Sequence, residues 1–139
     1  MKAPQTHLTI PPAIKLYVGF VGLFGLLFAF SSYFSPAQIS PAADMSNPAT
    51  RLAFYTVGST VLALTIGLFL AILSNRPQSL ILLLVVRTFA ALQDFFIALV
   101  LGLGWILFAV QAVVFILGVI SVVKLFGMLQ AAEKEATLS

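Results

Sequence analysis

Four long apolar runs constrain this chain more than any other feature of its sequence. They cover residues 14–34, 52–73, 80–101 and 105–127. About 20 residues of α-helix, rising 1.5 Å each, cross the roughly 30 Å hydrocarbon core of a bilayer. Inside lipid the backbone must satisfy its own hydrogen bonds, so each run is predicted to be a helix. We therefore expect an all-α fold, an integral membrane four-helix bundle.

Composition agrees with lipid as the solvent of this chain. Hydrophobic residues make up 61% of the sequence and charged residues only 8%, whereas about a quarter of an average soluble domain is charged. The net charge of +3 comes without a cluster of basic residues, so no nucleic-acid partner is expected. The chain has no cysteine and a single histidine, His7. Neither a metal site nor a bound cofactor is therefore expected.

Prolines and turn residues place the expected helix ends within one domain, residues 1–139. The helices are predicted near residues 12–34, 48–74, 77–102 and 104–130. Pro12, Pro48 and Pro77 suit a first helical turn, where a missing N–H costs no intrahelical bond. Residues 35–47 are predicted to form the one long loop, and residues 102–104 a tight hairpin. The segment AAEKEA after residue 130 is expected to be a solvated extension of the last helix.

The basic residues near the helix ends predict the orientation. Five of them fall on one side of the predicted topology, namely Lys2, Lys15, Arg76, Lys124 and Lys134. Only Arg51 falls on the other side. Lysine and arginine concentrate in cytoplasmic loops. We therefore expect both termini in the cytoplasm of a multi-pass protein of a cell membrane, most simply the bacterial cytoplasmic membrane.

Two charged residues interrupt the third apolar run, LVVRTFAALQDFF. Arg87 and Asp94 are two helical turns apart, so they project from one face of a helix, separated by about 10 Å. Ala91 continues that face, whereas Phe89 and Phe96 lie on the opposite, lipid-facing side. A lone charge at mid-membrane costs about 2.5–3.5 kcal/mol even on insertion scales. Both charges are therefore predicted to point into the bundle.

Other polar residues are predicted to reach the same depth. Arg51, Tyr55 and Ser59 are spaced by four and share one face of the second long helix. Gln93 and Gln111 are further candidates for binding a ligand, and Thr65 is the expected neighbour of Arg87. Two interpretations of the charges stay open. One is an Arg–Asp brace that locks helices together, formed by Asp94 with Arg51 or with Arg87 across two turns. The other is a polar cavity that opens outward.

Small residues line one side of the first helix, at Gly22, Gly25, Ala29 and Ser32. Small side chains let helices approach closely. The pattern predicts a tight packing seam, and the alternative is that it leaves room for a ligand.

The chain resembles the DoxX-like group of small bacterial four-helix membrane proteins. The matching features are the length of about 140 residues, Asn47-Pro48 with Arg51 opening the second helix, and Arg87 with Asp94 in the third. The resemblance implies a cytoplasmic-membrane protein, in some relatives tied to quinone or redox systems. This chain has no cysteine to take part in redox chemistry.

Three functions stay open on the sequence. The first is binding of a lipophilic small molecule with a polar head, quinone-like or lipid-like, either alone or as an accessory subunit. The second is an enzyme acting on a lipophilic substrate by epoxide opening or isomerisation, with Asp94 as general acid or base and Arg87 or Tyr55 holding a substrate oxygen. The third is a structural subunit of a homo-oligomer or a larger membrane complex.

Overall fold

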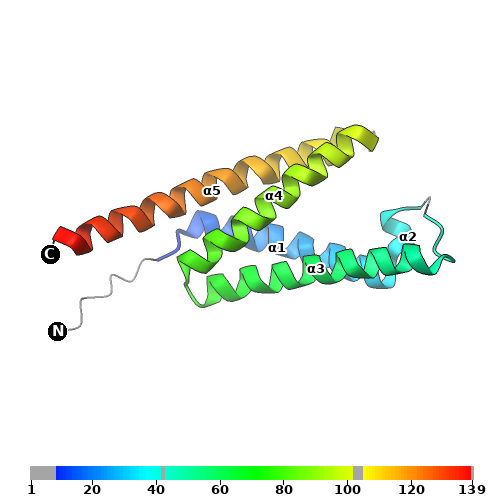
Figure 1. The fold of residues 1–139 in the computed structure, drawn as a ribbon, viewed down its shortest axis with the longest axis horizontal. Coiled ribbons are helices and arrows are strands. Elements are labelled where there is room, and N and C mark those ends of the chain that lie inside the picture. The colour runs from blue at the N-terminus through cyan, green and yellow to red at the C-terminus, as the bar shows by residue number, and fades with distance from the viewer. Residues whose placement is uncertain (1–8, 42, 102–104, 139) are drawn as a thin grey trace. The chain divides into compact units, whose positions relative to one another are not determined.

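The structure is a computed structural model that describes residues 9–41, 43–101 and 105–138 (Figure 1). Within this part of the chain all regular secondary structure is helical, and it contains no strand. The helices are α1 (Pro12–Phe34), α2 (Pro36–Ile39), α3 (Pro48–Leu73), α4 (Pro77–Leu101) and α5 (Trp105–Leu138). The expected all-α fold is confirmed for these residues. The predicted hairpin at 102–104, and Lys2 and His7 in the N-terminal tail, lie outside the described residues.

Four of these helices, α1, α3, α4 and α5, are long and apolar enough to cross a membrane. Their most apolar windows have mean hydropathies between 2.0 and 2.5. This confirms the four predicted helices, each suited in length and composition to a membrane span, as a multi-pass membrane protein requires. With 34 residues, α5 is about 51 Å long, well beyond the 30 Å that a hydrocarbon core requires. Its last turns contain the charged AAEKEA segment, which is helical up to Leu138.

Local signals explain where the helices begin. Proline is the first residue of α1, α3 and α4, where its fixed φ angle favours the helix and its missing N–H is not needed. Asn47 caps α3, because its Oδ1 accepts a hydrogen bond of 2.9 Å from the Ala49 backbone N–H. Asn47 therefore provides the N-cap of α3, directly before Pro48.

The turn between α3 and α4 is closed by a left-handed residue. Asn75 has a φ of 49°, a conformation that asparagine tolerates better than most residues. The Asn75 N–H donates to the Ile72 carbonyl and the Arg76 N–H to the Ala71 carbonyl, each at 3.0 Å. This pair of bonds is the Schellman arrangement that ends a helix. Asn75 Oδ1 also accepts a hydrogen bond of 3.2 Å from the Ile10 N–H, which ties the start of the described chain to this turn.

The predicted loop of residues 35–47 contains one element that the sequence did not indicate, the single-turn helix α2. Later in the loop, Asp44 Oδ1 accepts hydrogen bonds from the Ser46 hydroxyl (2.6 Å) and the Ser46 N–H (2.9 Å). These bonds favour the charged carboxylate and lower the pKa of Asp44 below its usual value.

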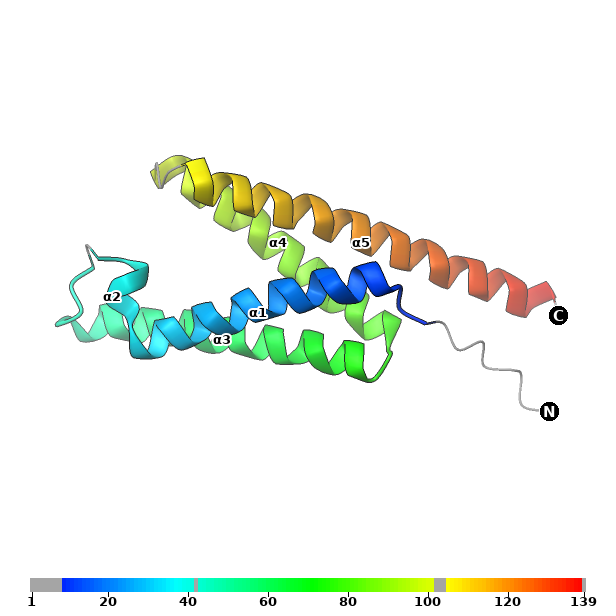
Figure 2. The ribbon, with the colours of Figure 1, turned by 180° about the vertical axis from the view of Figure 1, so that it is seen from behind.

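The chain divides into two compact units, each of which is described by itself. One is Val18–Leu70, called here the α1–α3 unit. The other contains the residues up to Tyr17 and those from Ala71 onward, and is called the α4–α5 unit. Within it α4 and α5 pack against each other as an antiparallel pair (Figures 1 and 2).

The α1–α3 unit is held by the predicted seam of small residues. A Cβ atom added at Gly22 would lie 2.6 Å from Cζ of Phe69, and one at Gly25 would meet the Thr65 hydroxyl. Ala29 and Ser32 are almost completely buried. The packing role of this face of α1 is therefore confirmed, since contacts this close leave no space for a side chain or a ligand.

Candidate functional site

The seven side chains predicted to form a site are divided between the two units. Arg51, Tyr55 and Ser59 belong to α3 in the α1–α3 unit, whereas Arg87, Gln93, Asp94 and Gln111 belong to the α4–α5 unit. The structure brings together members within each unit, and the convergence of the two groups stays a prediction.

In the α1–α3 unit the three predicted residues are exposed, and two of them, Tyr55 and Ser59, have local partners. The Ser59 hydroxyl donates to the Thr56 carbonyl of its own helix at 2.9 Å. The Tyr55 ring stacks on that of Tyr33, with 5.7 Å between ring centroids and 19° between planes. Arg51 is exposed one turn earlier on the same face of α3. Thr65 is buried deeper in the same helix, against Gly25.

In the α4–α5 unit, Arg87 and Asp94 lie on one face of α4, and both are half-buried. Ala91 between them is completely buried, whereas Phe89 and Phe96 are 61% and 54% exposed. This confirms the predicted facing of the helix. Gln93, next to Asp94, is exposed.

Neither charge makes a hydrogen bond or an ion pair within the described part of the chain. Two helical turns keep Arg87 and Asp94 about 10 Å apart along the axis, so a direct brace between them is not formed.

Gln111 on α5 lies at the depth of Asp94. Asp94 is about 10 Å before the end of α4, and Gln111 is about 9 Å after the start of α5, at 1.5 Å per residue. The side-chain oxygen of Gln111 is buried and has no hydrogen-bond partner among the described residues. Gly118 and Ser121, farther along α5, are buried as well.

The sequence did not predict a contact of three helices, α1, α4 and α5, that lies farther along α5 than Gln111. The Tyr17 hydroxyl of α1 donates to the Val114 carbonyl of α5 at 2.8 Å. A Cβ atom at Gly118 would meet the Thr88 hydroxyl of α4, and would lie 3.2 Å from the Tyr17 oxygen. Gly118, inside a run of bulky apolar residues, was the one available signal for such a close approach.

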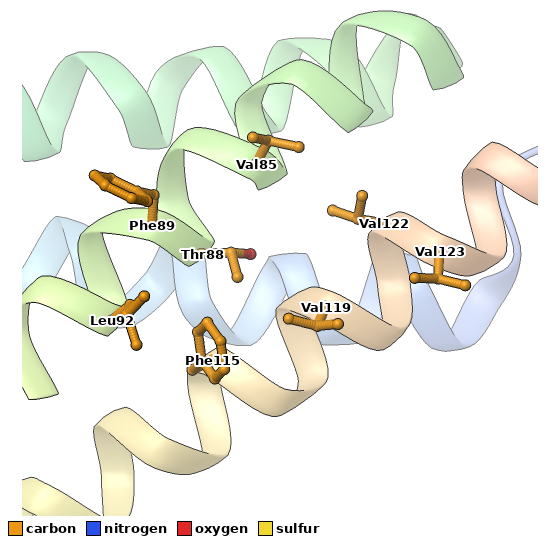
Figure 3. A pocket seen from close by; sticks show the side chains of 8 residues that line it. All are labelled: Val85, Thr88, Phe89, Leu92, Phe115, Val119, Val122 and Val123. Carbon is orange, nitrogen blue, oxygen red and sulfur yellow. The ribbon is translucent and has the colours of Figure 1, made fainter.

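A groove between α4 and α5 lies apart from the predicted residues. It has a volume of about 250 Å³ and is lined by Val85, Thr88, Phe89, Leu92, Phe115, Val119, Val122 and Val123 (Figure 3). None of the seven predicted side chains lines it. Apolar character alone cannot single out such a groove in the sequence, because lipid-facing and helix-facing surfaces are equally apolar in a membrane protein.

The α4–α5 unit therefore contains a set of three polar side chains, Arg87, Asp94 and Gln111, called here the polar set, and an apolar groove. Comparison of the chain with models of known protein families, with curated proteins and with solved structures finds no match.

Proposed function

We propose that this chain is a small multi-pass membrane protein that binds a lipophilic molecule with a polar head, of quinone-like or lipid-like type. One observation supports this most directly. Arg87, Asp94 and Gln111 lie within membrane-spanning helices of one unit, and within the described residues none of the three has a hydrogen-bond partner for its charged group or buried oxygen.

Lipid tails supply neither a hydrogen-bond partner nor a counter-charge for such groups. Leaving a buried donor or acceptor unsatisfied costs about 1–3 kcal/mol, and more for a charged group. Ionisable residues within membrane spans are therefore rare and are often functional. A ligand head with both accepting and donating atoms would satisfy the Arg87 guanidinium, the Asp94 carboxylate and the Gln111 amide together. Arg51, Tyr55 and Ser59 belong to the other unit, and the proposal does not depend on them.

Analysis of what co-purifies with the protein tests this function. The full chain is extracted in a mild detergent, and solvent extracts are compared by mass spectrometry with the total membrane lipids. We expect one lipophile to be enriched to a nearly constant ratio with the protein. An extract with the same composition as the membrane would contradict binding, and a co-purifying protein in its place would support a subunit of a complex.

The proposed location is the bacterial cytoplasmic membrane, with both termini in the cytoplasm. The five-to-one distribution of basic residues supports this orientation, and the resemblance to DoxX-like proteins supports the membrane. A reporter enzyme that is active only outside the cytoplasm, fused after Ser139, is expected to be inactive, and the same reporter in the loop near Asp44 is expected to be active. The reverse pattern of reporter activity would show that the C-terminus lies outside the cytoplasm and that the proposed orientation is wrong.

A further inference from the structure

Three segments of the α4–α5 unit each carry one exposed basic side chain, and the three are called here the basic end. They are Lys15 near the start of α1, Arg76 directly before α4, and Lys124 on α5. None of them makes an ion pair or a side-chain hydrogen bond among the described residues. Their positive charges are therefore available to a partner from outside the chain.

A hydrogen bond joins two of these segments. The Ile10 N–H donates to Asn75 Oδ1 at 3.2 Å, which ties the residues before α1 to the turn that carries Arg76. Arg76 is itself fixed by its N–H, which donates to the Ala71 carbonyl at 3.0 Å. The starts of α1 and α4 therefore lie at the same end of the unit.

Buried apolar residues anchor the backbone beside the lysines. Ile14, directly before Lys15, is 4% exposed, and Leu125, directly after Lys124, is completely buried. Neighbouring residues on a helix point in different directions. The apolar side chains thus face the protein interior, and the two ammonium groups face outward.

The depth of these residues matches the edge of a hydrocarbon core. Lys124 lies about 28 Å along α5 from Trp105 at 1.5 Å per residue, and the core is about 30 Å thick. Lys15 is about 4 Å from the first residue of α1, and Arg76 directly precedes α4. Long basic side chains at such a boundary extend into the polar layer, which contains the phosphates of phospholipids.

The chain supplies no acidic side chain near these charges. Its four acidic residues are Asp44, Asp94, Glu133 and Glu135. Asp44 belongs to the α1–α3 unit, and Asp94 is about 27 Å from Arg76 along α4. Glu133 is about 14 Å beyond Lys124 on α5. Neither α1 nor α4 has an acidic residue in its first turn, where the positive end of the helix dipole favours an anion.

We propose that the basic end binds the head of a phospholipid with two phosphates, diphosphatidylglycerol (cardiolipin). Two phosphates joined in one head can contact basic side chains of separate segments in a single binding event, which raises the affinity. Basic clusters between helices at a membrane boundary are suited to such heads. The exposed side chains of Gln78 and Ser79, in the first turn of α4, add hydrogen-bond donors beside Arg76.

This lipid site is independent of the function proposed above, because it uses none of the polar set. Arg87, the member of that set nearest to Arg76 along α4, is about 17 Å farther into the membrane.

Native mass spectrometry of the full chain in detergent tests the proposal. The chain is titrated separately with tetraoleoyl cardiolipin, dioleoylphosphatidylglycerol and dioleoylphosphatidylcholine, and each bound lipid is counted by its mass. We expect the first cardiolipin to bind about 100-fold more tightly than phosphatidylcholine, since each basic residue near a membrane surface contributes roughly fivefold. Phosphatidylglycerol, with one phosphate, should have an intermediate affinity.

Lys124→Gln should weaken cardiolipin binding about fivefold, because it removes one of the three charges. Lys134→Gln is its matched control and should leave the affinity unchanged. It removes the same charge from an exposed position of the same helix, about 15 Å farther along. Lys124→Arg keeps the charge and should keep the affinity. Circular dichroism establishes that each variant retains its helix content.

Equal affinities of cardiolipin and phosphatidylcholine would overturn the proposal, and so would equal effects of Lys124→Gln and Lys134→Gln. Several cardiolipins binding with one common affinity would also overturn it, because a general attraction to a charged surface would explain them. If two phosphatidylglycerols bound as tightly as one cardiolipin, the preference for a two-phosphate head would be wrong.

Sodium pyrophosphate separates a lipid from free phosphate, because it has two joined phosphates and no acyl chain. It should not displace cardiolipin at equal concentration, and displacement would show that phosphate alone occupies the basic end. The titration identifies the added lipid by its own mass, whether or not another lipophile co-purifies. This test and that of the proposed function can therefore fail separately.

Discussion

Replacing Gly118 by valine is expected to disrupt the pairing of α4 with α5 and to destabilise the chain. A Cβ atom there would meet the Thr88 hydroxyl, and it would also lie 3.2 Å from both the Thr88 Cβ and the Tyr17 oxygen. Overpacking of this kind costs about 1–3 kcal/mol. Displacement of Tyr17 would add the loss of its hydrogen bond to the Val114 carbonyl, worth about 1 kcal/mol. Thermal unfolding in detergent, followed by circular dichroism, measures the effect.

Gly127 is the matched control on the same helix. No atom lies within 4 Å of a Cβ added there, so Gly127→Val should leave stability unchanged or raise it slightly, because valine has the higher helix propensity. The milder Gly118→Ala, combined with Thr88→Ala, should recover part of the loss, since residues in contact are energetically coupled. Equal melting temperatures for the two valine variants would show that α4 and α5 do not approach closely at Gly118.

Arg87→Leu and Asp94→Asn are expected to remove the co-purifying lipophile while leaving a folded protein. Each change deletes a charge that the proposed ligand head would pair with, and a hydrogen bond to a charged group contributes about 1.5–3 kcal/mol. That range corresponds to a roughly 10- to 100-fold loss of affinity. Arg87→Leu should not reduce insertion, because leucine enters the membrane far more readily than arginine. Mass spectrometry measures the ratio of lipophile to protein in each variant, and circular dichroism measures helix content.

Asp44→Asn is the control for the loss of a carboxylate. Asp44 is exposed in the loop between α2 and α3, and its described hydrogen bonds are to Ser46. Its replacement should leave the bound lipophile unchanged. If Arg87→Leu and Asp94→Asn retained the lipophile at the wild-type ratio, the polar set would have no part in binding. If both variants instead lost helix content, the charges would be needed for assembly.

The helical spans could be predicted from the sequence because they depend on local properties. The length of each apolar run, and the prolines at positions 12, 48 and 77, determine where a helix can cross lipid and where it begins. The burial of Ala29 and Ser32 on α1 could be predicted too, since residues at helical spacing share a face and small ones favour close contact. The same periodicity placed Arg87 and Asp94 on one face of α4.

Only the tertiary structure decided which side chains meet between helices. The contact of Thr88 with Gly118 and the groove beside it depend on the register of α4 against α5, and the Tyr17 bond to the Val114 carbonyl depends on how the start of α1 packs on α5. In a soluble protein the apolar face of a helix would indicate that register. In lipid both faces of a helix are apolar, so hydropathy does not distinguish a packed side from a lipid-facing one, and contacts between individual side chains decide the pairing. The sequence by itself therefore determined the helices and their small-residue faces, and the tertiary structure determined the pairing that leaves the Thr88 hydroxyl and the Gln111 oxygen unpartnered among the described residues.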